Sequence, residues 1–145
     1  MTEEVYAKAL RLLAKREHSR ADLLQRLSDV PQSTLQAVLD RLEREGCLSD
    51  ERVAEALQRR AARRHGLLRL QQDFRQHGID DAIARPRLEE AARQELALAQ
   101  EVRAARFADH PRSPEEWAKQ ARYLHYRGFT AETIRRVLAR TAGTD

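Results

Sequence analysis

The sequence predicts an all-α protein made of three tandem three-helix repeats of the helix-turn-helix type, forming an elongated, curved helical protein. Three observations support this fold class. Ala, Leu, Arg, Glu and Gln dominate the 145 residues, and these residue types favour helices. No stretch alternates apolar and polar residues for long enough to indicate a strand. One apolar pattern also recurs at about 50 residues, which is the signature of a repeat architecture.

Start and stop signals order the helices along the chain. Ser19 and Ser113 each precede an acidic residue three positions later, which is the pattern of a capping box. Asp80 and Thr130 are the expected N-caps of the helices that follow them. The glycines expected as left-handed C-cap residues are Gly46, Gly66, Gly78 and Gly128. These signals place helices near residues 3–16, 20–28, 32–45, 50–64, 67–77, 81–91, 95–108, 114–127 and 131–140.

The sixth and seventh of these helices are the least clearly separated. No breaker lies between residues 88 and 97, so the two segments are also compatible with one continuous helix. Pro86 falls inside the sixth helix. A proline there removes a backbone hydrogen bond and is expected to cost ~3 kcal/mol or to kink the helix.

The repeat becomes visible when the residues that follow each turn are aligned. Val30, Ile79 and Phe129 are each followed nine residues later by a leucine, which is the spacing of one helical face. On the preceding helix, Leu27, Phe74 and Leu124 occupy a common position. The repeats are therefore expected at residues 1–46, 47–91 and 92–145, within one continuous domain.

Composition limits the possible compartments and partners. The chain has 27 basic and 23 acidic side chains, a net charge of +4, and nearly all of the positive charge is arginine. An arginine-rich surface favours phosphate or carboxylate partners. Cys47 is the single cysteine, so no intrachain disulfide is possible. It is expected to be a small buried residue. The N-terminus does not fit a signal peptide, and no apolar run is long enough for a membrane span. We expect a cytoplasmic monomer.

Motifs that carry chemistry are missing from the sequence. No glycines lie at the spacing of a phosphate-binding loop, and the five histidines form no metal-binding pattern with each other or with cysteine. The paired acids at Asp80 and Asp81 lie early in an expected helix, where the helix dipole favours them. Those at Glu89 and Glu90 are likewise expected to be structural. The sequence therefore predicts a protein that is not an enzyme and that uses no metal or other cofactor.

Basic residues cluster in two segments. Residues 52–79 carry seven arginines against two carboxylates, and residues 117–140 carry six basic residues against one carboxylate, so each segment has a net charge of +5. Either segment is expected to contact DNA phosphates or an acidic protein groove, unless its arginines only form a solvated face. The candidate partner- or DNA-binding residues are Arg59, Arg60, Arg63, Arg64, Arg69, Arg75, Lys119, Arg122, Tyr126, Arg127, Arg135 and Arg136.

Several blocks of the sequence resemble the RecX family of RecA regulators. They are YAKALRLLAKREHSRADLLQRL, LEREGCLSDERVAEA, HGLLRLQQDFRQHGI and YLHYRGFTAETI, in this order and across most of the chain. The resemblance implies a fold of three tandem three-helix repeats and no chemistry of its own. It also implies binding in the groove of the RecA–DNA filament and inhibition of RecA ATPase, strand exchange and coprotease activity, in DNA repair, recombination and the SOS response.

Residues carried over from the family fall in three places. The block LEREGCLSDERVAEA retains Gly46, Leu48, Asp50, Arg52 and Ala54. The block HGLLRLQQDFRQHGI retains Gly66, Arg69 and Gly78, and YLHYRGFTAETI retains Arg127, Gly128 and Phe129. Departures occur at Cys47 and Val53, where the family favours tyrosine and phenylalanine. They also occur at Arg64 and His65, where it favours glycine and an aromatic residue.

Two other functions remain open. The chain fits a helix-turn-helix protein that reads duplex DNA with its last helix, through Arg135 and Arg136. Against that, this helix offers no Asn or Gln for adenine, and nothing indicates a dimer. A purely scaffolding protein would bind no nucleic acid. For the leading hypothesis, the expected partners are the RecA filament and single- or double-stranded DNA.

Overall fold

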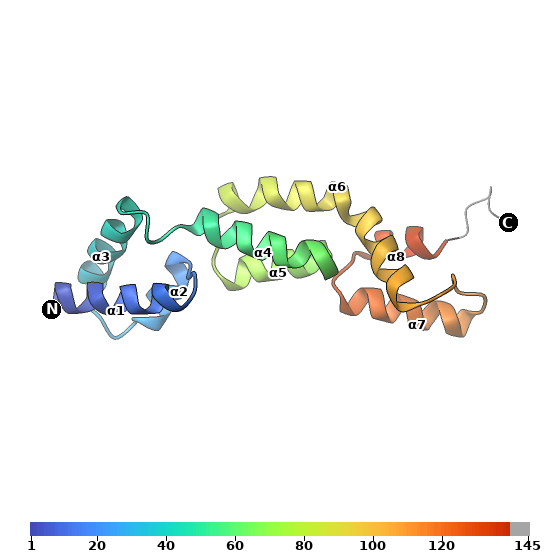
Figure 1. Ribbon diagram of the computed structural model, residues 1–145, viewed down its shortest axis with the longest axis horizontal. Helices are drawn as coiled ribbons and strands as arrows, with labels where there is room; N and C mark the ends of the chain where they lie inside the picture. Colours follow the sequence, from blue (N-terminus) through green and yellow to red (C-terminus); the bar gives the residue numbers. More distant parts are fainter. Residues whose placement is uncertain (140–145) are drawn as a thin grey trace. The chain divides into compact units, whose positions relative to one another are not determined.

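A computed structural model describes residues 1–139 of the chain. These residues form eight α-helices and no strand (Figure 1). The helices are α1 (Thr2–Lys15), α2 (Arg20–Arg26), α3 (Gln32–Arg44), α4 (Asp50–Arg64), α5 (Leu67–Gln76), α6 (Asp81–Arg106), α7 (Pro114–Tyr126) and α8 (Ala131–Leu138). The all-α fold class predicted from the composition is confirmed. Arg140, which was counted in the second basic segment and as the end of the last helix, lies outside the described residues.

The described chain divides into two compact units. The first contains Met1–Ala56 and Phe74–Ala84, and the second contains Leu57–Asp73 and the chain from Arg85 onward. Helices α4, α5 and α6 each contribute residues to both units. The repeat boundaries expected after residues 46 and 91 stay a prediction.

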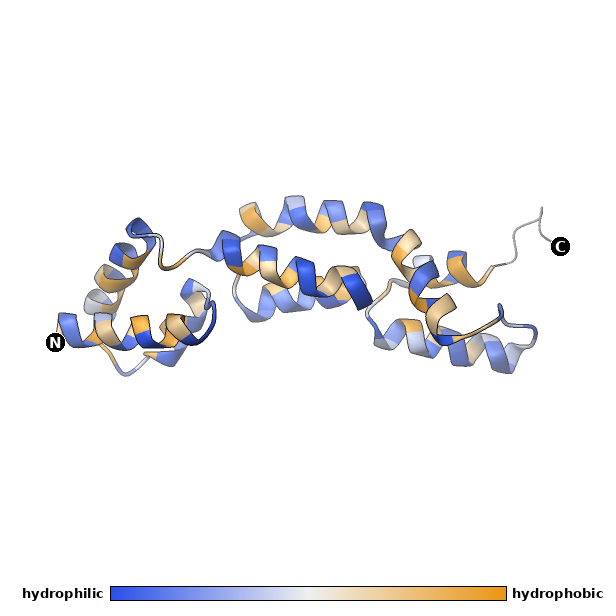
Figure 2. Ribbon diagram, in the orientation of Figure 1, coloured by the Kyte–Doolittle hydropathy of each residue, from blue (hydrophilic) through white to orange (hydrophobic). Residues whose placement is uncertain are grey.

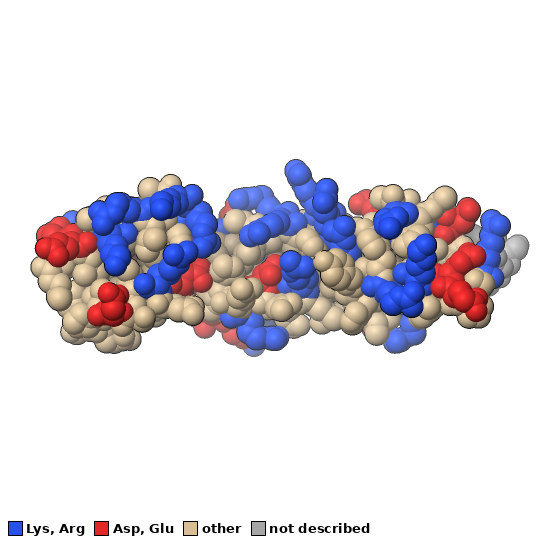
Figure 3. Space-filling model, turned by 90° about the horizontal axis from the view of Figure 1, so that it is seen from below, with Lys and Arg blue, Asp and Glu red and all other residues tan. Residues whose placement is uncertain are grey.

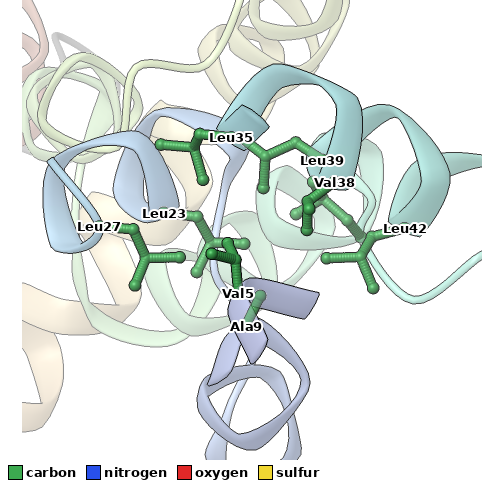
Figure 4. Close-up of a cluster of buried hydrophobic side chains, with 9 residues drawn as sticks. Val5, Ala9, Leu23, Leu27, Leu35, Val38, Leu39 and Leu42 are labelled. Carbon is green, nitrogen blue, oxygen red and sulfur yellow. The ribbon is translucent and has the colours of Figure 1, made fainter. Parts of the chain in front are cut away.

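Helices α1, α2 and α3 enclose the core of the first unit. In Figure 4, leucines of α2 and α3 point toward Val5 and Ala9 of α1. Leu23 and Leu39 are fully buried, and each buried leucine contributes roughly 2 kcal/mol of hydrophobic free energy. Cys47 is partly buried against this core, so it serves there as a small apolar residue.

The C-terminal helices form the core of the second unit. Ala99 of α6 and Leu124 of α7 pack with Phe129 and with the buried face of α8. Phe129 and Leu124 are fully buried. Hydrophobic and hydrophilic residues are interspersed along the helices, as the colours of Figure 2 show. In α8 this gives a buried apolar face, with Ile134 and Val137 inside and Arg135 and Arg136 exposed.

Most of the predicted repeat positions are buried. Leu27, Phe74 and Leu124, which share a place before the turn, are all 2% exposed or less. After the turn, Ile79 and Phe129 are buried, whereas Val30 is only half-buried. The apolar pattern of the sequence therefore identified the core face of each turn.

Of the two arrangements compatible with the sequence, the separate helices at residues 81–91 and 95–108 are wrong and the continuous helix is confirmed. A single helix, α6, runs from Asp81 to Arg106. Helix formers fill residues 88 to 97, so once the helix has started nothing stops its propagation. Pro86 lies within α6 without ending it. The proline ring removes the bond to the carbonyl of Ala82, and that residue is exposed, so water can replace the missing partner.

Three of the four glycines expected at helix ends adopt the left-handed conformation. Gly46, Gly78 and Gly128 have φ values of 78°, 63° and 92°, which glycine adopts at little cost. The prediction is wrong for Gly66, because φ is not positive there. The need for glycine at position 66 comes instead from a close approach of another backbone segment, described below.

No helix within residues 1–139 combines the length and the apolar character needed to cross a membrane.

Candidate functional site

The second unit places the turn between α7 and α8 against the start of α5. The Gly66 amide donates to the Arg127 carbonyl at 2.9 Å. The Leu68 amide donates to the Gly128 carbonyl at 3.0 Å. A Cβ at Gly66 would lie 2.6 Å from that Gly128 oxygen, and a Cβ at Gly128 would lie 2.6 Å from the Cβ of Arg69. Only glycine fits at either position, because the two backbones touch directly. We call this contact the second junction.

A buried carboxylate from α6 completes the second junction. Glu95 is 5% exposed and accepts a hydrogen bond from the Leu67 amide at 2.6 Å. Its other oxygen accepts from the hydroxyls of Thr130 and Thr133 at 3.0 and 2.6 Å. Gly66 has no side chain with which to cap α5. Glu95 therefore supplies the acceptor, and its negative charge is favoured at the N-termini of both α5 and α8.

The first unit contains the corresponding contact, which we call the first junction. Here the turn before α6 lies against the start of α2. The Ser19 hydroxyl donates to the His77 carbonyl at 2.5 Å and accepts from the Asp22 amide at 3.0 Å. The Asp22 carboxylate accepts from the Ser19 amide, which completes the predicted capping box, and lies 2.9 Å from Nδ1 of His77. A Cβ at Gly78 would lie 2.5 Å from the Cβ of Ala21.

Two groups at the first junction, Asp22 and His18, have pKa values lowered from their usual values. Partial burial acts to raise the pKa of Asp22, but hydrogen bonds from the Ser19 amide and His77 outweigh it and lower the pKa. Burial also lowers the pKa of His18, which is 2% exposed and whose Nε2 has no hydrogen-bond partner among residues 1–139. A polar hollow of about 330 Å³ is lined by Arg16, His18, Asp22, Gln25, Arg26 and His77.

A larger open groove adjoins the second junction. It has a volume of about 460 Å³ and is lined by Arg63, Arg64, Glu101, Val102, Ala105, Arg106, Tyr123 and Arg127. We call it the arginine groove, because four guanidinium groups face one carboxylate. Within residues 1–139, none of these five charged groups forms an ion pair. The groove is therefore a concentration of uncompensated positive charge.

Helix ends explain how four arginines can share one groove. Arg63 and Arg64 close α4, Arg106 closes α6, and Arg127 is the C-cap of α7. The carbonyl end of a helix carries partial negative charge and stabilises cations there. Three such ends therefore hold the arginines in place without carboxylate partners.

Aromatic rings fix the position of two of the guanidinium groups. Those of Arg106 and Arg127 lie 5.6 and 5.3 Å from the centre of the Tyr123 ring. Tyr123 in turn meets Phe107 edge to face at 5.6 Å. Such contacts order the arginine side chains and leave their charge intact. The Nε of Arg127 is buried and has no hydrogen-bond partner within the described residues.

Neighbouring His65 adds no positive charge at neutral pH. Burial of the imidazole, together with the nearby Arg69 and Arg127, lowers the pKa of His65. The site is thus positively charged through arginine alone, which keeps its charge at every physiological pH.

Only part of the predicted binding set meets in the groove. Arg63, Arg64 and Arg127 line it, whereas the other candidates are spread over the surface. Exposed residues outside the groove are Arg59 and Arg60 of α4, Arg69 and Arg75 of α5, Lys119, Arg122 and Tyr126 of α7, and Arg135 and Arg136 of α8. Arg69 lies 3.7 Å from Asp73, and Arg75 belongs to the first unit. Basic side chains on the face in Figure 3 likewise form separate groups.

Two important residues were missed by the sequence reasoning. Arg106 was assigned to a separate seventh helix outside both basic segments, and its neighbour Phe107 was the signal that could have drawn attention to it. Glu95 carried no sequence signal, because its partners lie 28 and 35 or more residues away. Only the packing of α6 shows its role.

The fold and the site define an all-α helical-repeat protein with an arginine-rich surface. Residues 93–138 match the family model described as the third three-helix domain of RecX. The chain is 40% identical over 142 residues to the regulatory protein RecX of Halorhodospira halophila, covering 95% of this chain and 88% of the relative. It is 38% identical to that of Ralstonia nicotianae, covering 91% and 84%. The chain therefore belongs to the RecX family of regulatory proteins.

Solved structures agree with this fold. The crystal structure of RecX from Lactobacillus salivarius superposes with a TM-score of 0.78 at 19% identity, covering 94% of each chain. Another crystal structure, of a regulatory protein RecX, gives a TM-score of 0.77 at 19% identity, covering 94% of this chain and 72% of that one. At this identity the likeness establishes the all-α repeat fold.

Proposed function

We propose that the protein is a non-enzymatic regulator that binds the RecA–DNA filament and mainly inhibits RecA. Inhibition would extend to the ATPase, strand-exchange and coprotease activities. Its membership of the RecX family carries this proposal. The arginines that have no ion-pair partner on the second unit support it, because they offer a surface for the acidic groups of a filament. The cytoplasm, where RecA works, is the compartment that follows from this proposal.

Adding the purified protein to RecA on single-stranded DNA tests the proposal. At substoichiometric amounts, the rate of DNA-dependent ATP hydrolysis by RecA should fall. A regulator that acts on a filament needs few copies, because each copy affects many subunits. An unchanged ATPase rate at saturating protein would contradict the proposal.

A triple variant tests which residues carry the interaction. Arg122→Ala, Arg135→Ala and Arg136→Ala together remove exposed charges of α7 and α8. We leave Arg127 in place, because its guanidinium packs on Tyr123. The variant should keep its helical circular dichroism and lose most of its inhibition of RecA.

A control with the same change in charge comes from three other exposed arginines. Arg11→Ala, Arg44→Ala and Arg93→Ala lie outside the candidate set. This control should inhibit RecA as well as the parent protein does. Equal loss in both triple variants would show that overall charge, and no particular surface, is responsible.

Duplex DNA distinguishes the alternative function. A helix-turn-helix reader would bind one duplex sequence selectively at moderate salt, with no effect on RecA. The alternative depends on Arg135 and Arg136, which are exposed on α8, whereas Ile134, Val137 and Leu138 of the same helix are buried in the core. Weak, sequence-independent binding with a steep salt dependence would support the filament regulator.

A further inference from the structure

We infer that the arginine groove of the second unit is a binding site for the phosphodiester backbone of single-stranded DNA, used by the protein on its own. The inference goes beyond the proposed function, because it needs no RecA. It names one site, formed by Arg63, Arg64, Arg106 and Arg127, with Glu101 as the opposing charge.

Charge is the first argument. The groove brings four guanidinium groups against a single carboxylate, and no ion pair within the described residues neutralises any of them. The polar hollow of the first junction offers a contrast. There, two arginines, Arg16 and Arg26, line the hollow together with the Asp22 carboxylate, which also lies 2.9 Å from Nδ1 of His77. Of these two hollows, the arginine groove therefore has the larger unsatisfied demand for anions.

The chemistry of the donors is the second argument. Each guanidinium is planar and can donate two parallel hydrogen bonds to phosphate oxygens. Arg106 and Arg127 are held against Tyr123 at 5.6 and 5.3 Å, so less conformational entropy is lost when an anion binds. The groove is thus preorganised for a chain of phosphates.

The lining of the groove favours nucleic acid over an acidic peptide. Apart from Tyr123, its uncharged lining consists of Val102 and Ala105. Tight peptide docking needs large apolar anchors in desolvated pockets, and these two small side chains provide none. Binding to a phosphate backbone is mainly electrostatic and needs no such anchor.

Concave shape favours a single strand over a duplex. Proteins read a duplex with an element that projects into its groove, whereas a flexible strand can enter a positively charged hollow. Tyr126, which directly precedes Arg127, is 79% exposed. Its ring is available for stacking with a base of the bound strand.

Fluorescence anisotropy with labelled 20-nucleotide oligothymidylate and the full chain alone tests the inference. Arg63→Ala with Arg106→Ala should weaken binding on the order of tenfold and reduce the salt slope of the affinity by about 1.4. The matched control, Arg44→Ala with Arg93→Ala, removes two exposed arginines outside the groove. It should change the affinity less than twofold. Equal weakening by both pairs would overturn the inference.

A gain-of-binding variant excludes loss of folding as the explanation. Glu101→Gln removes the one carboxylate among the described residues that line the groove and should tighten oligothymidylate binding about threefold. Glu115→Gln, at an exposed position outside the groove, should leave it unchanged. If both glutamine variants bind equally, the inference is wrong.

Competitors decide the class of ligand. A 20-base-pair duplex and polyglutamate of similar charge should displace the strand less effectively than unlabelled oligothymidylate does. Tighter binding of the duplex would overturn the choice of a single strand. Equal displacement by polyglutamate would identify the groove as an acidic-peptide site.

Discussion

In the first unit the turn at Gly78 lies against the start of α2, and in the second unit the turn at Gly128 lies against the start of α5. The first junction is closed by the side chain of the helix cap itself, because the Ser19 hydroxyl donates a hydrogen bond to the carbonyl of His77. The second junction is closed by backbone hydrogen bonds at Gly66 and by the buried carboxylate of Glu95.

The two junctions share the same contact between a turn and the start of a helix, but they use their charged side chains differently. At the first junction the Asp22 carboxylate is hydrogen-bonded to Nδ1 of His77 and to the Ser19 amide, so it is used within the junction. At the second junction, Glu95 replaces the missing side-chain cap of α5. Arg127, which corresponds in position to His77, packs on Tyr123 and forms no ion pair within residues 1–139. Among the described residues, the arginines beside the second junction have no ion-pair partner, which makes it the candidate binding region.

Among the predicted losses of stability, a side chain that obstructs the close backbone approach at Gly128 should have the largest effect. Gly128→Ala combines left-handed strain with a clash against Arg69, and we expect a loss of about 3 kcal/mol in the free energy of unfolding. Gly66→Ala meets backbone atoms at 2.6 Å and should cost about 2 kcal/mol. Urea unfolding measures both values.

Gly46→Ala is the control for backbone strain. Its φ is 78°, and a Cβ there meets nothing within 4 Å, so the loss should be about 1 kcal/mol. If Gly128→Ala were no more damaging than Gly46→Ala, the second junction would not be tightly packed.

Loss of the anionic cap should distinguish the two junctions. Glu95→Ala leaves the Leu67 amide and two threonine hydroxyls without their acceptor, so we expect a loss of about 2.5 kcal/mol in urea unfolding. Ser19→Ala removes one cap and one bond to a carbonyl, which should cost about 1.5 kcal/mol. The exposed control Glu115→Ala should stay within about 0.5 kcal/mol. A larger loss for Ser19→Ala than for Glu95→Ala would reverse the comparison.

The hydrogen bond between Asp22 and His77 at the first junction should contribute less. A double-mutant cycle of Asp22→Asn and His77→Gln should give a coupling free energy of about 0.5 to 1 kcal/mol at neutral pH. The exposed pair Arg52 and Glu17, at 2.7 Å, provides the comparison and should couple more weakly, because solvent screens it. A coupling near zero for Asp22 and His77 would mean that Ser19 alone holds this junction.

Acid should weaken both junctions, and this effect is the smallest. Burial lowers the pKa of His18 and of His65 in the folded state, so the unfolded chain binds protons more readily. The free energy of unfolding should therefore fall as the pH drops below about 6.5, the usual histidine value. Urea midpoints at pH 7.5 and pH 5.5 measure this fall. The double variant His18→Gln with His65→Gln should show a smaller fall than the parent chain, and an equal fall would place the sensitivity elsewhere.

Local signals in the sequence were enough for most of the fold. Ser19, Ser113 and Thr130 were predicted as N-caps, and each accepts a backbone hydrogen bond three residues later. These contacts lie within one helical turn, so the pattern of residue types already contains them. Residues 88–97 contain no stop signal, so the sequence was compatible with two helices or with one, and the structure shows the single helix α6.

The candidate site was less accessible to sequence reasoning. The two basic segments included Arg63, Arg64 and Arg127 but also many arginines that lie elsewhere on the surface. Arg106 was left out, because it lay in neither segment. Convergence of three helix ends determines which arginines share a groove, and a count of charge along the chain cannot show that convergence.

The sequence by itself determined the helical class, the repeated apolar positions and the local caps, because periodicity and capping act over a few residues. Only the tertiary structure decided that Gly66 must be glycine, that Glu95 is a buried cap and that Arg106 joins the groove. Each of these depends on segments 17 to 62 residues apart. Packing brings such segments together, and the chain carries no short-range pattern that records it.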